Sequence, residues 1–309
     1  YILFLKFFSI SLTIFKIEYI LKEIFIKFSS IYMKNLKFSD FIIQIPTHKK
    51  KFLEICRLEK PRAIISGPEE ELLVLAKNKK IFQDQGIILL TPDYETVKIC
   101  ADKIATYEFF KKINIPSPEI FIGEKNIKYP LILKPRFGRG GAQVFKVNNN
   151  NELRFFIKKV NAPILQEFAA GQEYTVDIFS DLVGRPLSLV PRTRIQVESG
   201  ISMKGRTVYD QEIMDLSKKI AEELKLIGPA CVQCIKTKKG IKFIEINTRF
   251  GGGSILSLKA DPTIIINLIK IIKGEKPIRS KGFKQGLTML RYYCEVYNDN
   301  NIIYDSRIF

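Results

Sequence analysis

The segment Ile241–Gly253, IKFIEINTRFGGG, limits the fold more than any other part of this 309-residue chain. Glu245, Asn247 and Arg249 recur at every second position, so on an extended strand their side chains share one face. A carboxylate, an amide and a guanidinium do not suit a hydrophobic core. They suit a magnesium–polyphosphate, because Mg²⁺ prefers oxygen ligands and arginine binds phosphate.

An upstream strand is expected to pair with this one. Residues 230–237 and 241–247 flank Lys238-Lys239-Gly240, which fits a three-residue hairpin loop with a left-handed glycine. Such a loop places Gln233 opposite Glu245, with both side chains on one face. Gln233, Glu245 and Asn247 then form an oxygen cluster suited to one or two Mg²⁺ ions against a nucleotide. The alternative is an exposed polar sheet face without a ligand.

Composition narrows the class of protein. Hydrophobic residues make up 46% and charged residues 27%, as in a globular protein. The net charge of +18 suits an anionic partner, but no basic block is interleaved with aromatics. We therefore attribute the charge to a lysine-rich composition and expect no nucleic-acid partner. The 5 cysteines are odd in number, which favours a reducing cytoplasm over a disulfide framework. Cys231 and Cys234 should face opposite sides of a strand, and no second Cys/His pair completes a zinc site.

Residues 1–34 form an atypical apolar segment that is interrupted by charges such as Lys6, Lys16 and Glu18. No apolar run reaches the roughly 18–20 residues of a membrane span, and no signal-peptide cleavage pattern is present, so we expect no transmembrane segment. A peripheral amphipathic helix is the alternative. The chain begins at Tyr1 rather than Met, from which we expect a fragment or an altered 5′ end.

From residue 35 the pattern predicts an α/β domain. Buried strands alternate with helices, which indicates parallel strands in βαβ units. We expect strands at 41–45, 61–66 and 86–90, and helices at 49–60 and 68–80, with further helix starts at Pro92-Asp93 and Asp102. Ile115-Pro116-Ser117-Pro118 is a stiff connector, where we place the main domain boundary.

Beyond the connector, strands follow one another directly. This order predicts an α+β region built from antiparallel hairpins. We expect strands at 131–134, 143–147, 164–167, 173–180, 188–197 and 287–296, and helices at 150–160, 210–225, 254–258 and 262–273.

Two further motifs suit a nucleotide. Lys134-Pro135 ends a strand, and the glycines of Arg136–Gly141 suit a mobile flap whose backbone N–H groups approach phosphate oxygens. The flap is not a Walker A loop, since no Gly-Lys-Ser/Thr precedes a helix; a glycine-rich hairpin without a ligand is the alternative. Residues 166–169 could present their backbone to an adenine edge and Glu173 its carboxylate to a ribose, although a Glu-Gly-Glu run is more often a solvated turn.

Taken together, in this order and spacing, these motifs resemble the ATP-grasp superfamily. The set is Lys134-Pro135 with the glycine flap, Gln166-Glu167 with Glu173, and Gln233 with Glu245-x-Asn247-x-Arg249. The likeness is strongest to the large chain of carbamoyl-phosphate synthase and its stand-alone relatives, with biotin carboxylase and D-alanine–D-alanine ligase more distant. It implies a preATP-grasp-like parallel-sheet α/β domain over 35–114, then a two-subdomain ATP-grasp fold over 115–309, divided into 115–168 and 169–309.

The resemblance also implies a role for each matching residue. ATP phosphates would meet Lys103 and Lys134 beneath a flap of Gly138, Gly140 and Gly141; adenine would meet Gln166, Glu167, Phe168 and Ala169, and ribose Glu173. Mg²⁺, or Mn²⁺ in its place, would be held by Glu245 and Asn247, with Gln233 where relatives carry a ligand. Arg249 would hold the phosphorylated intermediate, and Arg192 and Arg194 would face the acceptor.

By this likeness the chain is expected to be a cytoplasmic ATP-dependent ligase. It would form an acyl phosphate on a small carboxylate substrate and transfer the acyl group to an amine or similar nucleophile, releasing ADP. The pattern is single, without a glutaminase-like site, so carbamoyl phosphate synthesis itself is not expected. A degenerate nucleotide-binding protein stays an alternative, because residues 1–34 lack the glycine-rich first turn of relatives. A basic nucleic-acid-binding protein is another, and its affinity should fall steeply with salt. A homodimer is left open.

Overall fold

A computed structural model describes residues 41–42, 53, 56–57, 60–65, 67, 69–121, 127–138, 140–198, 200–292, 296–299 and 302–305. The apolar segment 1–34, His48 and Arg139 lie outside the described residues, as do parts of the strand predicted at 41–45 and of the helix predicted at 49–60. Within the described part, no helix combines the length and the apolar content needed to cross a membrane.

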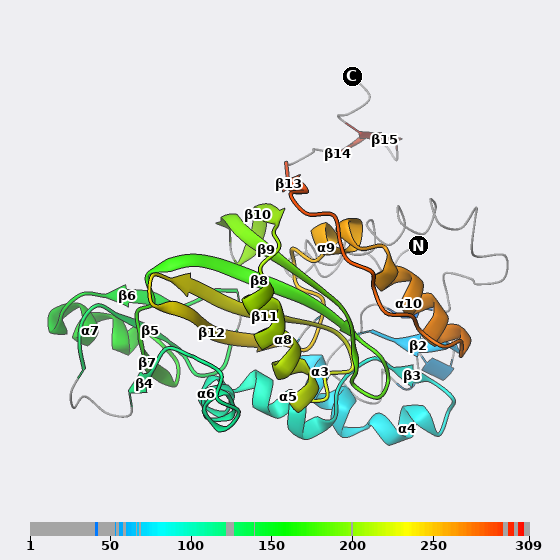
Figure 1. The fold of residues 1–309 in the computed structure, drawn as a ribbon, viewed down its shortest axis with the longest axis horizontal. Coiled ribbons are helices and arrows are strands. Elements are labelled where there is room, and N and C mark those ends of the chain that lie inside the picture. Colours follow the sequence, from blue (N-terminus) through cyan, green and yellow to red (C-terminus); the bar gives the residue numbers. More distant parts are fainter. Residues whose placement is uncertain are drawn as a thin grey trace.

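The N-terminal region is a small parallel sheet with helices packed around it (Figure 1). Ala63 pairs in parallel with both Phe41 and Ile88, which confirms the βαβ pattern. The elements are β1 (Phe41–Ile42), β2 (Ala63–Ile64), α3 (Glu69–Lys77), α4 (Lys79–Gln83), β3 (Ile88–Leu89), α5 (Tyr94–Ala101) and α6 (Lys103–Lys112). The single helix predicted over 68–80 is wrong in extent. It breaks at Asn78, whose side-chain amide donates to the Val74 carbonyl 2.7 Å away and competes with helix continuation.

An antiparallel sheet of 4 strands follows, in the order β4-β7-β5-β6. Its strands are β4 (Ile120–Phe121), β5 (Leu131–Pro135), β6 (Phe145–Val147) and β7 (Pro163–Glu167). Helix α7 (Asn150–Phe156) and the 3₁₀ turn η2 (Ile157–Lys159) connect β6 to β7. Leu131, Leu133 and Leu153 are buried together in its core, because alternate residues of β5 point toward the helix. The short strand β4 was not predicted from the sequence.

The largest unit is an antiparallel sheet of 6 strands in the order β12-β11-β8-β9-β10-β13. The strands are β8 (Gly171–Ser180), β9 (Pro186–Glu198), β10 (Ile201–Thr207), β11 (Gly228–Thr237), β12 (Gly240–Asn247) and β13 (Thr288–Leu290). The helices are α8 (Gln211–Glu223), α9 (Ile255–Ala260) and α10 (Thr263–Lys273), and a hairpin of β14 (Val296–Asp299) and β15 (Ile302–Asp305) follows. Figure 1 shows α8 on one face of this sheet and α10 beside the parallel strands. Strand β10 was missed in the sequence because Gly205 and charged residues interrupt its apolar pattern.

One face of the large sheet forms the main hydrophobic core. Val176, Val232 and Phe243 lie against Ile213 and Ile220 of α8 and Phe110 of α6. A set of hydrophobic residues from α10 covers part of the opposite face, where Phe179 and Val190 contact it. The middle of that opposite face carries polar side chains instead.

Replacing Phe243 by alanine should lower the free energy of unfolding by about 3–5 kcal/mol, because a fully buried ring leaves a cavity. Phe243 is 0% exposed, and its ring centroid lies 6.2 Å from that of Phe110. Urea unfolding measures the loss. Phe155→Ala is the matched control, since Phe155 is 59% exposed and should change stability little. Equal losses in the two variants would contradict this assignment of the core.

Candidate functional site

The candidate site lies on the polar face of the large sheet. Its strands bring side chains from distant parts of the chain into lines that cross the sheet. By strand register, one line contains Glu245, Gln233, Thr175 and Arg192, and the next contains Asn247, Cys231 and Asp177. The predicted pairing of Gln233 with Glu245 is confirmed.

The predicted loop of this hairpin is wrong, although the pairing is right. Thr237 pairs directly with Gly240, so the loop has one residue fewer than expected. The register then shifts between Gln233 and Cys234, and Ile244 has no partner in the ladder. Such a β-bulge adds one residue to a strand and reverses which face the following side chains occupy.

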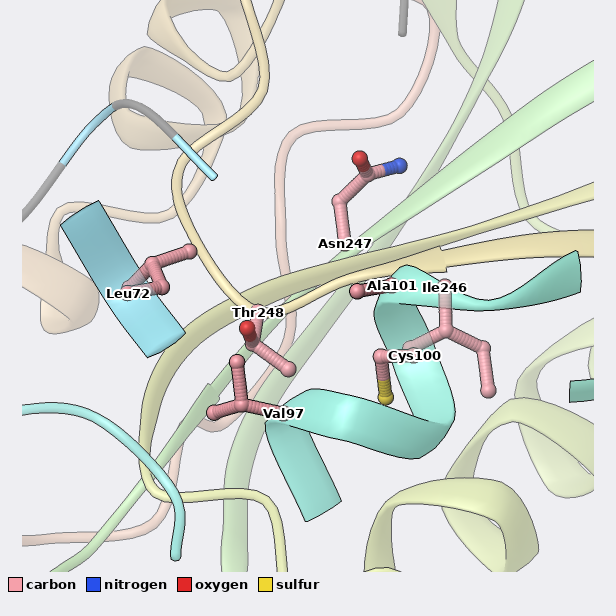
Figure 2. A pocket seen from close by; sticks show the side chains of 7 residues that line it. All are labelled: Leu72, Val97, Cys100, Ala101, Ile246, Asn247 and Thr248. Carbon is pink, nitrogen blue, oxygen red and sulfur yellow. The ribbon is translucent and has the colours of Figure 1, made fainter. Parts of the chain in front are cut away.

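This bulge takes Glu245 and Asn247 out of the core. Ile241 and Phe243 before the bulge and Ile246 after it belong to the same buried cluster under α8. Without the extra residue, alternation would place Glu245 on the side of Phe243. The close-up in Figure 2 shows the result at the end of β12, where Asn247 points away from α5 while Ile246 and Thr248 point toward it.

Hydrogen bonds link the three polar residues of β12 and its extension. Asn247 Nδ2 donates to Glu245 Oε1 at 3.1 Å, and Arg249 Nη2 donates to Asn247 Oδ1 at 3.1 Å. The expected convergence of a carboxylate, an amide and a guanidinium is therefore present. No group of three or more His, Cys, Asp or Glu side chains suited to a metal occurs in the described part of the chain. A metal here would rely on one carboxylate, on amide oxygens and on phosphate oxygens of a ligand, which is a donor set that Mg²⁺ accepts.

Lys134 approaches this cluster from the other sheet. It lies on β5 and is 7% exposed. The pKa of Lys134 is lowered to about 8, mainly because burial disfavours the charged amine; the Glu245 carboxylate opposes this shift, and nearby Lys103 adds to it. A buried lysine of lowered pKa, with a second lysine near it, makes a region of excess positive charge. Such a region favours an anionic ligand.

The glycine flap is anchored at its base by Asp102. This residue caps α6, and the Arg136 guanidinium donates two hydrogen bonds to its carboxylate, at 2.8 and 2.6 Å. Burial raises the pKa of Asp102, but the bonds from Arg136 and from the α6 N–H groups outweigh burial and lower it overall. Lys103 Nζ donates to the Gly138 carbonyl at 2.8 Å. Lys103, one of the two lysines expected at the phosphates, therefore contacts the flap.

Both the flap and the turn that it contacts need glycine. Gly138, Gly140 and Gly141 have φ values of 125°, 70° and 72°, which other residues rarely adopt. In addition, a Cβ atom on Gly200, between β9 and β10, would lie 2.4 Å from Gly140 Cα. The flap thus rests directly on the β9–β10 turn.

The segment expected at adenine lies where the two sheets meet. Gln166 is buried and donates to the Pro118 carbonyl at 3.3 Å, and Ala169 is buried as well. Lys242 of β12 donates to both carboxylate oxygens of Glu167, at 2.5 and 2.6 Å. Burial raises the pKa of Glu167, but Lys242 and a backbone N–H overcome this and lower it. Lys146 Nζ lies 4.3 Å from the centre of the Phe168 ring. The Glu167 carboxylate is thus bonded to Lys242, and one face of the Phe168 ring is covered by Lys146.

The two arginines expected at the acceptor have different surroundings. Arg194 forms an ion pair with Glu173, lies 3.5 Å from Gln233 Oε1 and donates to the Gly200 carbonyl at 2.9 Å. Arg192 is 3% exposed, and its Nε donates to Asp177 at 2.7 Å. Burial opposes the charge of Arg192, yet Asp177 raises the pKa of Arg192 overall. Arg194 therefore borders the polar face, while Arg192 lies beneath it.

Sequence reasoning assigned no role at the site to Asp177, Ser254, Ser257 and Lys242, and it predicted Asp102 only as a helix start. Asp177 continues the period-two pattern of Glu173 and Thr175, so strand alternation could have identified it. Ser254 and Ser257 contact Asp177 across 77 and 80 residues of sequence, and no local pattern predicts such contacts. The two cysteines occupy opposite faces, as predicted: Cys234 lies in the core, and Cys231 lies in register with Asp177.

A small cavity lies where α3 and α5 meet the end of β12. It is lined by Leu72, Val97, Cys100, Ala101, Ile246, Asn247 and Thr248 (Figure 2). Its volume of about 10 Å³ holds about one water molecule. This cavity is not a nucleotide site.

The sequence of residues 100–253 matches the family model of the ATP-grasp domain. The matched range contains Lys103, the glycine flap and the Glu245–Arg249 segment. The chain therefore contains an ATP-grasp domain, and the fold is a mixed α/β ATP-grasp-like fold, as expected from the resemblance.

Solved structures share this fold at low sequence identity. A Campylobacter jejuni biotin carboxylase in a β,γ-ATP complex aligns with a TM-score of 0.66 and 17% identity, over 77% of this chain and 60% of that one. The biotin carboxylase domain of Hydrogenobacter thermophilus 2-oxoglutarate carboxylase, in complex with MgADP, ADP and bicarbonate, aligns with a TM-score of 0.66 and 17% identity, over 83% of this chain and 69% of that one. The biotin carboxylase subunit of a pyruvate carboxylase aligns with a TM-score of 0.56 and 19% identity, over 78% of this chain and 60% of that one. The particular likeness to carbamoyl-phosphate synthase stays a prediction.

Proposed function

We propose that this protein is an ATP-dependent ligase that activates a carboxylate as an acyl phosphate and passes the acyl group to an amine or similar nucleophile. One observation carries the proposal. Lys134 of the smaller sheet is buried, and its charge interacts with that of Glu245 on the larger sheet, inside the range that matches the ATP-grasp domain. Two sheets that bring a lysine and an oxygen cluster together suit the phosphates of a nucleotide. The MgADP and the β,γ-ATP complex named for the similar structures support this choice.

In this proposal, Lys134 and Lys103 hold the phosphates beneath the flap of Gly138, Gly140 and Gly141. The backbone of residues 166–169 lies along adenine. Glu173 gives up its ion pair with Arg194 and accepts hydrogen bonds from the ribose hydroxyl groups. Residues 115–168 and 169–309 are the two subdomains, following the domain at 35–114. Arg194 then turns toward the acceptor.

Metal binding would involve Glu245 and Asn247, with Gln233 beside them. Mg²⁺ would neutralise charge on the transferring phosphoryl group. The Glu245 carboxylate supplies negative charge, and each amide oxygen has a second lone pair besides the one that its arginine neighbour uses. The residues present therefore fit a single Mg²⁺ shared with phosphate oxygens.

The bond changes require no general base from the protein in the first step. A carboxylate oxygen of the substrate attacks the γ-phosphorus, the bond to the ADP oxygen breaks, and ADP leaves. Arg249 holds the acyl phosphate. The amine then attacks the carbonyl carbon, phosphate leaves with its bonding electrons, and the amine proton passes to phosphate or water. Fixed positive charges aimed at the phosphoryl oxygens are the main source of catalysis in such a site.

The proposal predicts that Mg-ATP binds and that ADP release is stimulated by at least one compound in a panel of amino acids and dipeptides. Hydroxylamine added to the reaction should give a hydroxamate, which reports the acyl phosphate directly. Binding is measured by calorimetry and ADP by a coupled assay. Mg-ATP binding without ADP or hydroxamate across the panel would favour a degenerate nucleotide-binding protein. Salt-sensitive binding of DNA or RNA, with no binding of Mg-ATP, would overturn the proposal in favour of the nucleic-acid alternative.

A further inference from the structure

A buried group of polar side chains joins the large sheet to the segment that follows β12. Asp177 on β8 accepts hydrogen bonds from Arg192 Nε at 2.7 Å, Ser254 Oγ at 2.5 Å and Ser257 Oγ at 2.5 Å. Arg192 also donates to Ser202 Oγ on β10 at 3.2 Å. We name these five residues the Asp177 cluster. Asp177 and Arg192 are 4% and 3% exposed, so neither charge is presented to solvent.

The glycines after Arg249 are shaped to this cluster. A Cβ atom on Gly253 would lie 2.6 Å from Arg192 Nη1, and one on Gly251 would lie 3.2 Å from Cys231 Sγ. The Arg192 guanidinium therefore packs directly on the turn backbone, where another side chain would collide with it. Gly251 N also donates to Ser254 Oγ at 2.8 Å, and the same hydroxyl donates to Asp177. Asp177 is thus connected through one serine to the turn.

This turn begins immediately after Arg249, which contacts Asn247 at the oxygen cluster. Moving the turn would move the Arg249 backbone and with it the guanidinium. A buried ion pair is a poor source of net stability, because removing both charges from water costs about as much as their attraction returns. It does fix geometry, and displacement of a reacting group by about 1 Å can lower a rate by about 100-fold.

We infer that Asp177 and Arg192 are positioning residues that hold the Arg249 segment in place for phosphoryl transfer, and that Arg192 does not contact the acceptor. This inference rests on the proposed function, which supplies the role of Arg249. Arg194 is then the arginine of the pair that meets the acceptor.

The test compares Asp177→Asn with Asp261→Asn. Asp261 is a matched control because it is 2% exposed, accepts a hydrogen bond from Ser188 Oγ on the same sheet at 2.5 Å, and accepts another from the Thr263 N–H at 3.0 Å. Its helix carries none of the proposed site residues. Both variants should lose stability in thermal unfolding. Only Asp177→Asn should lower ADP release with the amino-acid panel, by about 100-fold per folded protein, while changing the Kd for Mg-ATP by less than about threefold.

A second variant covers the case in which Asp177→Asn does not fold. Ser254→Ala keeps both charges but cuts the link from Asp177 to Gly251, so it should lower kcat in the same direction with the Kd for Mg-ATP retained. The inference is overturned if either variant keeps the wild-type kcat, or if Asp261→Asn loses as much kcat as Asp177→Asn. Failure of the proposed function is seen separately, since wild-type protein would then not bind Mg-ATP or not release ADP.

Discussion

A Glu245→Gln variant is expected to lose most of its ADP formation while keeping its fold. Asp177 and Glu173 on the same sheet face are already paired with Arg192 and Arg194. Glu245 instead accepts from the neutral amide of Asn247. Glutamine has the same shape and can still accept that bond, but it removes the negative charge that would attract a cation. Loss of one such electrostatic group typically lowers kcat by about 100- to 1,000-fold.

Two measurements separate loss of metal from loss of fold. Titration of Mn²⁺ followed by electron paramagnetic resonance, with a non-hydrolysable ATP analogue present, should show weaker Mn²⁺ binding in Glu245→Gln. The melting temperature should stay close to that of the wild type. Glu222→Gln on α8 is the control, because its side chain is 51% exposed and pairs with Lys218 on the far side of the core. Unchanged turnover in Glu245→Gln would rule out the assigned metal site.

A Lys134→Met variant is expected to bind Mg-ATP about 10- to 100-fold more weakly, as when a hydrogen bond to a charged group is lost. The wild type should also show a pH dependence that the variant lacks. The pKa of Lys134 is about 8 in the folded chain, against an ordinary value of 10.5. Phosphate binds the protonated amine, so the contribution of Lys134 to affinity is complete below about pH 8 and declines above it.

The contribution of Lys134 to folding stability changes with pH in the opposite direction to its contribution to Mg-ATP affinity. Between about pH 8 and pH 10.5 the unfolded chain keeps the Lys134 proton and the folded chain releases it. The unfolded state then binds more protons, so the contribution of Lys134 to stability rises with pH through this window. Calorimetric titration of Mg-ATP at several pH values checks the affinity, with Lys219→Met, an exposed residue of α8, as the control. An affinity that is flat between pH 7 and 10 in the wild type would contradict the role of Lys134 at the phosphates.

Local sequence patterns predicted the parts of the fold that depend on neighbours along the chain. The alternation of strands and helices predicted the parallel sheet, and the direct succession of strands predicted the antiparallel sheets. The pairing of Gln233 with Glu245 followed from polar residues at every second position on adjoining strands. The helix start at Asp102 followed from an N-cap residue ahead of an apolar run.

Contacts between distant segments could not be predicted in the same way. Lys242 meets Glu167 across 75 residues, and Asp177 meets Ser254 across 77 residues. Arg192 and Arg194, which are two positions apart on the same strand face, looked equivalent in the sequence. Their partners differ, because Arg192 bonds Asp177 and packs against Gly253 of the glycine turn, while Arg194 pairs with Glu173 and bonds the Gly200 carbonyl. The sequence pattern therefore located the polar face but not the layer beneath it.

The unpaired Ile244 makes the length of one short stretch of chain critical. Removal of a single residue between the hairpin tip and Glu245 would reverse which face of β12 each later side chain occupies. The Glu245 carboxylate would then point into the hydrophobic core, and Ile246 would face water. Removal of two residues would preserve the sides and only shorten the strand. This hairpin should thus tolerate the removal of an even number of residues better than the removal of an odd number, whatever the size of the deletion.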